Sequence, residues 1–293
     1  MLPQISRRPL LAGLVAAGTG VRAAASTTSQ NIKSIDLTDK ENLSLIFRKL
    51  GYSMDSRLGF WHLSAIRSGL VGTKFTPFWE MHIGRFFTTR DLPDGTYEVT
   101  QMGLTYYTDL NTGEFLRRFQ NPLTGKTVEI DYGVPKPRQY APPEPSTAQY
   151  ELIDARGSEP AGARRPGLSG VGGLGPAWIQ GDNIWIQQDH LLEYPSPGRP
   201  GAQAHVNDLT TYFGSLTEVA DPAAKMPRAG HAFTDVNDWP TWMQMGDQPG
   251  AYYSRGVGFK AFSFGEMPAK WKTLALQEHP RIAKDPLKAL QAG

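Results

Sequence analysis

A carboxylate and an imidazole stand two positions apart in the segment "WEMHIGRFFTT", residues 79–89. If this segment is a strand, Glu80 and His82 share one side of it, because side chains two positions apart point the same way. A carboxylate beside an imidazole orients the ring and raises its basicity, which suits proton transfer. The pair is therefore a candidate catalytic centre. The alternative is a mutually satisfied structural pair at the rim of a sheet.

Two further side chains are candidate proton carriers. His190 shares one face of its predicted strand with Gln188, with aliphatic residues around it, and the alternative for it is a half-buried core histidine. Tyr106 and Tyr107 are adjacent, so a strand would send one ring inward and one outward. An inward phenol can hydrogen-bond a substrate oxygen or act as a general acid, and we predict that role for Tyr107.

An arginine lies between two rings in "EFLRRFQ", where Phe115, Arg117 and Phe119 alternate. A guanidinium among rings can stack on them and still offer its fork to a carboxylate or phenolate. These three residues are therefore predicted to bind substrate. The alternative is an ion pair on an outer face, from Arg117 to Glu129 or Asp131 on the adjacent strand. The strand register decides between the two, and the sequence does not fix it.

A second arginine, Arg85, shares its strand face with Trp79, Met81 and other apolar residues. Trp242, in the segment "WPTWMQM", and Tyr253, in a tyrosine pair, could add rings to the same cavity. We therefore add Arg85, Trp242 and Tyr253 to the predicted substrate-binding residues. The alternative for "WPTWMQM" is a plug of the hydrophobic core.

Several kinds of chemistry lack their motifs. The chain has no cysteine, so no thiolate can serve as nucleophile or metal ligand. There is no His-Glu-x-x-His zinc motif and no Gly-x-Ser-x-Gly nucleophile elbow. The glycine-rich "GVGGLG", residues 170–175, lacks the lysine of a phosphate-binding loop. We therefore predict no cofactor and no metal.

The N-terminal residues have the order of an export signal. Arg7 and Arg8 precede a short apolar run, residues 10–21, and three alanines follow at 23–25. The paired arginines resemble the twin-arginine signal for passage to the periplasm, although the usual lysine is missing and ordinary secretion is the alternative. The run is too short to span a bilayer. We therefore expect cleavage after residue 25, with no membrane insertion of the product, and contact with the export machinery through the signal.

Cleavage would also change the charge. The full chain carries +2, and the signal holds three arginines and no acidic residue, so residues 26–293 would carry −1. A near-neutral protein lacks the electrostatic footprint of a nucleic-acid binder. No lysine- and arginine-rich run suggests anionic lipid. We therefore expect neither nucleic acid nor a membrane surface as a partner.

One helix is well specified, over residues 37–51. Thr38 and Glu41 fit the two halves of a capping box, and Gly51 fits a left-handed C-terminal cap. The apolar stripe that would pack this helix on a sheet consists of Leu43, Ile46, Phe47 and Leu50.

The remaining patterns indicate short antiparallel strands. Residues 59–133 resemble a meander, in which Gly113 and Gly125 take the positive-φ positions of two related turns. Residues 134–176 are rich in proline and glycine and are predicted to be a long excursion. Strand patterns resume at 177–194, and the C-terminal tail is helix-prone but interrupted at Pro280 and Pro286. Further predicted strands cover residues 205–216, 231–236 and 251–264.

Eight or more antiparallel strands favour a barrel that is closed or nearly closed, which removes the edges of the sheet. We expect a single, mainly β domain over residues 26–293. It would be a lipocalin-like (calycin-type) antiparallel barrel with an N-terminal helix and a helical C-terminal tail. A β-sandwich is the alternative.

Three features together resemble a known family. They are "YYTDLNTGEFLRRFQNPLTGK", "WMQMGDQPGAYYSRGVGFK" and the twin-arginine start. They are similar to a bacterial and fungal family known only as a domain of unknown function, whose members are often exported. The resemblance covers roughly residues 35–290 and implies one fold, lipocalin-like by architecture, and export. It implies no mechanism.

These observations lead to three functional hypotheses. The first is a cofactor-independent periplasmic enzyme, a lyase, isomerase or decarboxylase. It would act on a small apolar aromatic compound, such as a plant-derived phenolic, by general acid–base chemistry in the barrel cavity. The second is a lipocalin-like carrier of the same ligands without turnover. The third is an interaction module whose aromatic faces meet another protein.

Overall fold

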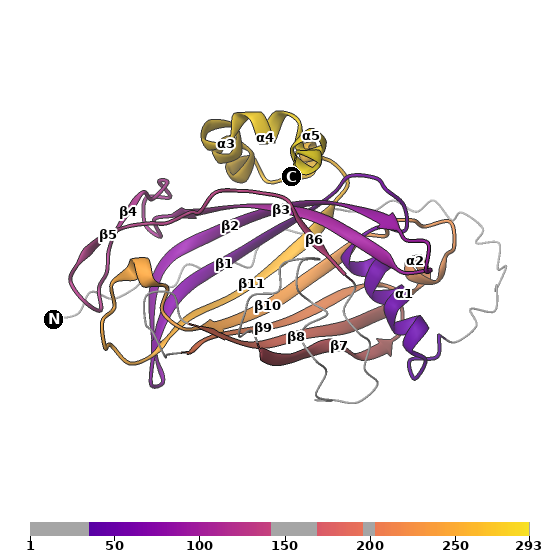
Figure 1. Ribbon diagram of the computed structural model, residues 1–293, viewed down its shortest axis with the longest axis horizontal. Helices are drawn as coiled ribbons and strands as arrows, with labels where there is room; N and C mark the ends of the chain where they lie inside the picture. The colour runs from indigo at the N-terminus through magenta and orange to yellow at the C-terminus, as the bar shows by residue number, and fades with distance from the viewer. Residues whose placement is uncertain (1–34, 142–168, 196–202, 293) are drawn as a thin grey trace, which may run out of the picture. The chain divides into compact units, whose positions relative to one another are not determined.

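The computed structural model describes residues 35–141, 169–195 and 203–292. The expected signal at 1–25 and most of the excursion at 134–176 lie outside these residues. The described part is mainly β and contains one large antiparallel sheet with a few helices (Figure 1). None of the described helices is long and apolar enough to cross a membrane.

The sheet has nine strands in the order β6-β3-β2-β1-β11-β10-β9-β8-β7. The first strand, β1, pairs on one side with β2 and on the other with the last strand, β11. At the centre of the sheet, the first and the last strand in chain order therefore lie side by side. The bounds are β1 Gly59–Val71, β2 Lys74–Asp91, β3 Tyr97–Thr108, β6 Arg138–Tyr140, β7 Ser169–Gln180, β8 Asn183–Pro195, β9 Gln203–Ser215, β10 Ala229–Asn237 and β11 Ala251–Ala261.

The sheet is curled but open, because no pairing joins β6 to β7 within the described residues. It is a half-barrel, which corrects the expectation of a closed or nearly closed barrel. The described strands do not form two facing sheets either, so they do not adopt the β-sandwich alternative. We call the inner face concave; it carries Leu63, Ile83 and Tyr212. The opposite face, which carries Phe86 and Tyr106, is called convex.

Two strand assignments differ from the sequence expectation. Residues 114–120 and 126–132 contribute only β4 (Arg118–Gln120) and β5 (Thr127–Glu129), which form a separate two-stranded hairpin. The glycine-rich residues 169–176, expected to be irregular, belong to β7, and a turn with positive φ at Gly181 separates β7 from β8. Glycine-rich residues can form a strand when a neighbouring strand, here β8, offers its backbone hydrogen-bonding groups.

The two related turns were predicted correctly. Gly113 has φ 72° and Gly125 has φ 70°, in the left-handed region that glycine adopts without a steric penalty. The Asp109 carboxylate accepts hydrogen bonds from the backbone N–H of Asn111 and Thr112. The Asn121 side chain accepts one from the N–H of Leu123. Side-chain bonds to the local backbone therefore fix both turns.

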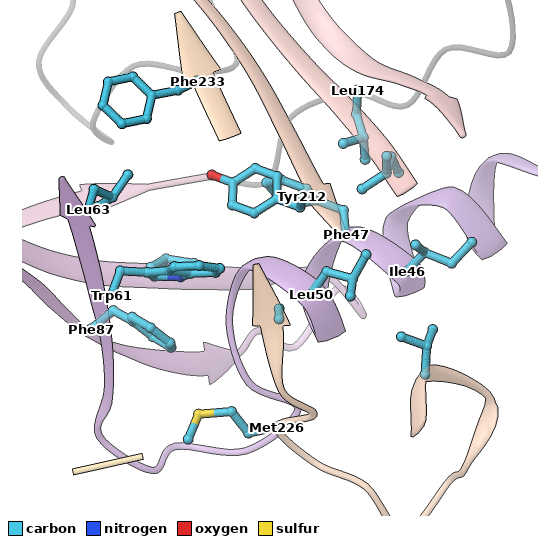
Figure 2. Close-up of a cluster of buried hydrophobic side chains, with 14 of the residues drawn as sticks. Ile46, Phe47, Leu50, Trp61, Leu63, Phe87, Leu174, Tyr212, Met226 and Phe233 are labelled. Carbon is cyan, nitrogen blue, oxygen red and sulfur yellow. The ribbon is translucent and has the colours of Figure 1, made fainter. Parts of the chain in front are cut away.

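Helix α1 (Lys40–Gly51) packs its predicted apolar stripe against the concave face at one end of the sheet. Figure 2 shows Phe47 and Leu50 lying toward Tyr212 and Trp61, and the rings of Phe47 and Tyr212 have centroids 5.4 Å apart. The predicted capping box is wrong, because Asp39 is the N-cap and accepts from the N–H of Glu41. The helix ends through Tyr52, whose N–H bonds the Arg48 carbonyl, so Gly51 needs no left-handed conformation.

A buried lysine joins this helix to the central strand. Lys260 of β11 is 1% exposed, and its ammonium donates to the carbonyl oxygens of Lys49 and Tyr52 at the C-terminal end of α1. Carbonyls at a helix end lack intrahelical partners and attract cations. Burial lowers the pKa of Lys260 well below its ordinary value. The helix therefore closes one end of the concave face through a polar contact as well as apolar packing.

The C-terminal tail forms three short helices over part of the convex face (Figure 1). Pro280 and Pro286 begin the second and third of them, as the sequence predicted. Trp271 is 1% exposed, and its ring lies over Gly84 of β2, where an added Cβ would come 2.1 Å from the indole. These helices are α3 (Ala269–Glu278), α4 (Pro280–Lys284) and α5 (Pro286–Gln291); the remaining short elements are α2 (Leu216–Ala220), η2 (Thr241–Met243) and η3 (Phe264–Glu266).

Candidate functional site

A cavity of about 1930 Å³ lies on the concave face and extends round the β3 edge of the sheet. Side chains of β1, β2 and β8 to β10 line its inner part. Residues 132–141 and the C-terminal helices line the part near β3. The inner part contains ionisable groups among apolar side chains, and these groups decide what chemistry the cavity can support.

A row of polar residues crosses the strands at the inner part of the cavity. His190 of β8 lies opposite Asp208 of β9, and Asp208 lies opposite Asp235 of β10. The row continues through Ser254 of β11 to Arg67 of β1. Directly opposed residues in an antiparallel sheet have their Cβ atoms about 5 Å apart, so neighbours in this row can interact.

The two carboxyl groups form an asymmetric pair. Asp235 accepts a hydrogen bond from the Ser254 hydroxyl at 2.7 Å and faces the guanidinium of Arg67 at 3.4 Å. Asp208 receives no such support: burial, then the charge of Asp235 and a hydrogen bond to it, raise the pKa of Asp208 to about 7. Asp208 therefore keeps its proton to a much higher pH than an ordinary aspartate, and it lies on the cavity wall beside Asp235.

Two neutral imidazoles lie on the same cavity wall, His190 directly opposite Asp208 and His231 four positions along β10 from Asp235. Burial lowers the pKa of His190 to about 4 and that of His231 to about 3. The Nε2 atom of each ring is buried and has no hydrogen-bond partner among the described residues. His231 is stacked on Tyr212, with ring centroids 4.7 Å apart. Both residues line the cavity, and which ring nitrogen carries the proton depends on the tautomer.

A half-buried cation completes the inner part of the cavity. Arg85 lines it, and no hydrogen bond or ion pair joins its guanidinium to another described residue. The charge of Arg85 partly offsets the rise in the pKa of Asp208 and of Tyr212, so the guanidinium is close enough to both groups to interact with them across the cavity. The Tyr212 hydroxyl donates to the Gln188 side chain at 3.4 Å. An anionic group in the cavity would find Arg85 available.

The predicted pair of Glu80 and His82 is formed, but on the convex face. A carboxylate oxygen of Glu80 lies 3.2 Å from Nε2 of His82 and 3.1 Å from the ammonium of Lys270 on α3. The same His82 nitrogen lies 3.2 Å from the Thr108 hydroxyl. Burial lowers the pKa of His82. The pair is on the opposite face from His190, and its contacts correspond to the structural alternative, in which it joins β2, β3 and α3.

Arg117 takes neither of its two predicted positions. Its side chain is exposed and binds both carboxylate oxygens of Glu278, at 2.6 and 2.9 Å, while Glu129 pairs with Arg118 instead. The guanidinium lies 5.1 Å from the Phe115 ring, so the expected arginine–ring contact exists outside the cavity. It connects the segment before β4 with the end of α3.

The other predicted aromatic residues pack together near the other end of the sheet. Tyr107, Phe119 and Trp242 surround the fully buried Trp79, with ring centroids 4.5 to 6.0 Å away. With the buried Met243 and Met245 they form a core cluster, which is the alternative stated for "WPTWMQM". Tyr253 packs on Phe75 at the edge of the convex face. Of the predicted site residues, the structure therefore places only Arg85 and His190 at the inner part of the cavity.

Sequence reasoning missed Asp208, Asp235 and Arg67. The signal was present, since Asp208 alternates with Thr210 and Tyr212, and Asp235 alternates with His231 and Phe233. A lone carboxylate on the apolar phase of a strand is an uncommon and informative pattern. It was overlooked because the pairing of β9 with β10, which sets these residues side by side, is not visible in the sequence.

No group of three or more His, Asp or Glu side chains in the described ranges could hold a metal ion. No motif in the sequence pointed to a cofactor, and the carboxyl pair can exchange protons without one. The groups that the cavity offers are therefore the chain's own acids, imidazoles and arginines.

Comparison with known proteins gives a match to a family model over the C-terminal part of the chain. No curated protein and no solved structure matches the chain. The family model described as "Protein of unknown function (DUF1838)" matches residues 175–292, which include β8 to β11 and both members of the carboxyl pair. The match confirms the expected resemblance to a family known only as a domain of unknown function, over residues 175–292. It covers less than the expected residues 35–290 and does not include the segment at 106–126.

Proposed function

We propose that this protein is a cofactor-independent acid–base enzyme, and that its reaction takes place at Asp208 and Asp235. The observation that carries the proposal is the adjacent pair of carboxyl groups on the cavity wall, of which Asp235 contacts Ser254 and Arg67 and Asp208 has its pKa raised to about 7. A protonated and an ionised carboxyl side by side can give and take a proton within one reaction.

The reaction class follows from these two groups. Asp235 would take a proton from a substrate carbon, while Asp208 would give its proton to the oxygen or leaving group that gains electrons. The net result is an isomerisation or elimination, in which no oxidant is consumed and one proton exchange restores both carboxyl groups. This is the chemistry of a lyase or isomerase, within the class expected from the sequence.

The substrate class follows from the surrounding side chains. Arg85 offers a cation to a carboxylate or phenolate, and the rings of Tyr212, His231 and Phe233 offer apolar faces beside it. A small aromatic compound with one acidic group fits both. The half-barrel would act as a lipocalin-type cup, and the N-terminal sequence supports action in the periplasm.

Transport without turnover is the second candidate function. It is favoured by the volume of about 1930 Å³, which exceeds the range of roughly 300–1,000 Å³ usual for small-molecule sites. A carrier would use Arg85 and the rings in the same way. It would not need the raised pKa of Asp208.

A substrate screen with matched variants separates the two functions. Aromatic carboxylates and phenols are incubated with the protein, and products are detected by mass spectrometry. We expect Asp208→Asn to reduce turnover about 100-fold or more, the usual contribution of a positioned acid or base. Ligand binding, measured by calorimetry, is expected to survive. Asp247→Asn, an exposed aspartate outside the cavity, is the control and should leave both unchanged.

The outcomes are distinct. Equal turnover in wild type and Asp208→Asn would reject the catalytic role of the pair. Binding without any turnover in wild type would favour the carrier. Failure of Arg85→Gln to weaken the binding of acidic aromatics would reject the assigned ligand class.

A further inference from the structure

Among the described residues, helices cover only one half of the convex face of the sheet. Helices α3 to α5 pack on β2, β3 and the nearby end of β1, with Trp271, Phe86 and Leu104 in the contact. The face of β11, β10, β9, β8 and β7 carries no described helix (Figure 1). The two halves of one face therefore have different surroundings.

The half on which no described helix packs, which we call the uncovered half, is apolar. Four of its aromatic side chains lie in one line that crosses the strands from β11 to β7, and Gly230 of β10 lies in the same line. The four are Phe259 of β11, Phe213 of β9, Trp185 of β8 and Trp178 of β7. Exposed fractions of its large apolar side chains run from 37% to 64%. They belong to Ile66, Trp178, Leu191, Leu209, Phe213, Val257 and Phe259.

The uncovered half contains a groove, with a positive charge on its β11 side and a negative charge on its β8 side. A groove of about 840 Å³ is lined by Ile66, Leu209 and Val257 together with Arg255 and Asp189. Arg255 of β11 and Asp189 of β8 belong to one cross-strand line, through Thr234 and Leu209. Three strand spacings, about 14 Å, separate the two charged residues. No ion pair joins either of them to another described side chain.

We propose that this uncovered convex half is the interface of a homodimer, in which two copies pack face to face about a two-fold axis parallel to the strands, between β9 and β10. The two-fold rotation exchanges the β11 side of the face with its β8 side. As a result, β11 of one copy lies over β8 of the partner, and β10 lies over β9. The strands of the two copies then run close to parallel, which is the usual arrangement of sheets packed face to face.

The charges complement each other under this operation. Arg255 of each copy faces Asp189 of the other, so one apolar contact is flanked by two identical ion pairs. Across the ring line, Phe259 of one copy faces Trp185 of the other. Arrangements that place Arg255 over Arg255 are disfavoured by repulsion, so the charge pattern selects this axis.

The exposed apolar area agrees with a dimer of ordinary size. The seven large apolar side chains together expose on the order of 700 Å², near the roughly 800 Å² that each partner contributes to a standard interface. A patch of this size exceeds the largest apolar patch of most monomers. This inference does not depend on the proposed enzymatic function, because the interface and the cavity use opposite faces of the sheet.

Sedimentation velocity over a wide concentration range tests the proposal. The wild type is expected to sediment as a dimer. Arg255→Glu should raise the dissociation constant about tenfold or more, because it sets two carboxylates against each other. Adding Asp189→Lys to it exchanges the two charges and should restore most of the affinity. Val257→Glu, at the most exposed large apolar position of this face, should abolish the dimer.

Arg118→Glu is the matched control, since Arg118 is an equally charged, exposed residue on the separate hairpin. It should leave the dimer unchanged. Far-UV circular dichroism and melting curves establish that each variant is folded. A wild type that is monomeric at all concentrations would overturn the proposal. So would a dimer that Arg255→Glu and Val257→Glu both leave intact.

Discussion

At the scale of single residues, Asp208 combines an unfavourable environment with a useful proton. Its neighbours Asp235 and Arg67 satisfy each other, so the cost of burying two carboxyl groups together falls on Asp208. A group held with a raised pKa next to a cavity is a recognised sign of function, and functional sites are commonly less stable than the fold could allow. The same environment therefore predicts a measurable stability effect.

The contribution of Asp208 to the free energy of unfolding falls as the pH rises. The folded pKa of Asp208, about 7, lies above its ordinary value of 3.8, so the folded state holds this proton more tightly than the unfolded chain. The stability that the proton contributes is present below pH 3.8 and is lost as the pH rises through 7. Asp208→Asn removes this dependence. We expect its melting temperature to exceed that of wild type by about 10 °C at pH 8 and to approach it at pH 4.

Thermal melts of both proteins across this pH range check the prediction. Asp247→Asn serves as the control, because its carboxylate is exposed. A stability difference that is the same at pH 4 and pH 8 would mean that Asp208 titrates normally. Sequence reasoning had chosen His82 and Glu80 as the acid–base pair, and only the strand pairing revealed that they and Asp208 are on opposite faces.

At the scale of elements, the C-terminal helices are attached to the sheet by a ring packed on a glycine. Trp271 of α3 occupies the space that a side chain at Gly84 would need, and its indole N–H donates to the Leu104 carbonyl at 3.2 Å. The close approach is possible only because β2 has no Cβ at this position.

Gly84→Ala should therefore destabilise the protein by about 1–3 kcal/mol, the usual cost of overpacking a core. Gly103→Ala is a matched control on the neighbouring strand, where the nearest atom to the added Cβ is 3.7 Å away, and it should cost less than about 1 kcal/mol. Urea denaturation followed by tryptophan fluorescence measures both. Equal losses in the two variants would show that the cost is in the strand backbone and not in the helix contact.

The individual helices and turns could be predicted more fully than the pairing of the strands. The apolar stripe of α1, the two glycine turns and the prolines that separate the C-terminal helices all follow from local spacing, and the structure confirms them. The hairpin β4–β5 was assigned wrongly to the large sheet, since a strand's own sequence does not state which edge it joins. Arg117 was misplaced for the same reason.

At the scale of the whole molecule, the half-barrel would couple the proposed ligand binding to global unfolding. The cavity is lined by strands from both halves of the sheet, so a bound ligand would stabilise all of them together. If acidic aromatics bind, a concentration 100 times the dissociation constant should add about 2.7 kcal/mol to the free energy of unfolding. Differential scanning fluorimetry should show the rise in wild type and a smaller one in Arg85→Gln. Neutral isosteres of the same ligands are the control, and a rise that ignores the acidic group would argue against Arg85 as its partner.

The fold class could be predicted from alternation and turn residues, whereas closure could not. A closed barrel and a curled sheet with two edges have the same strand patterns, and they differ only in whether β6 reaches β7. The site depended on that arrangement as well, because Arg85 and His190 face the same cavity from strands almost a hundred residues apart.

The pairing of β1 with β11 has a consequence for biosynthesis. The strands on either side of this seam can form two separate ribbons as the chain leaves the ribosome, but neither ribbon encloses the cavity. Only when residues 251–261 emerge can the two ribbons join, and the lysine that anchors α1 arrives in that same strand. Contacts between such distant residues make folding slow. The joining of the two ribbons is therefore expected to be the last and slowest step in the folding of the sheet.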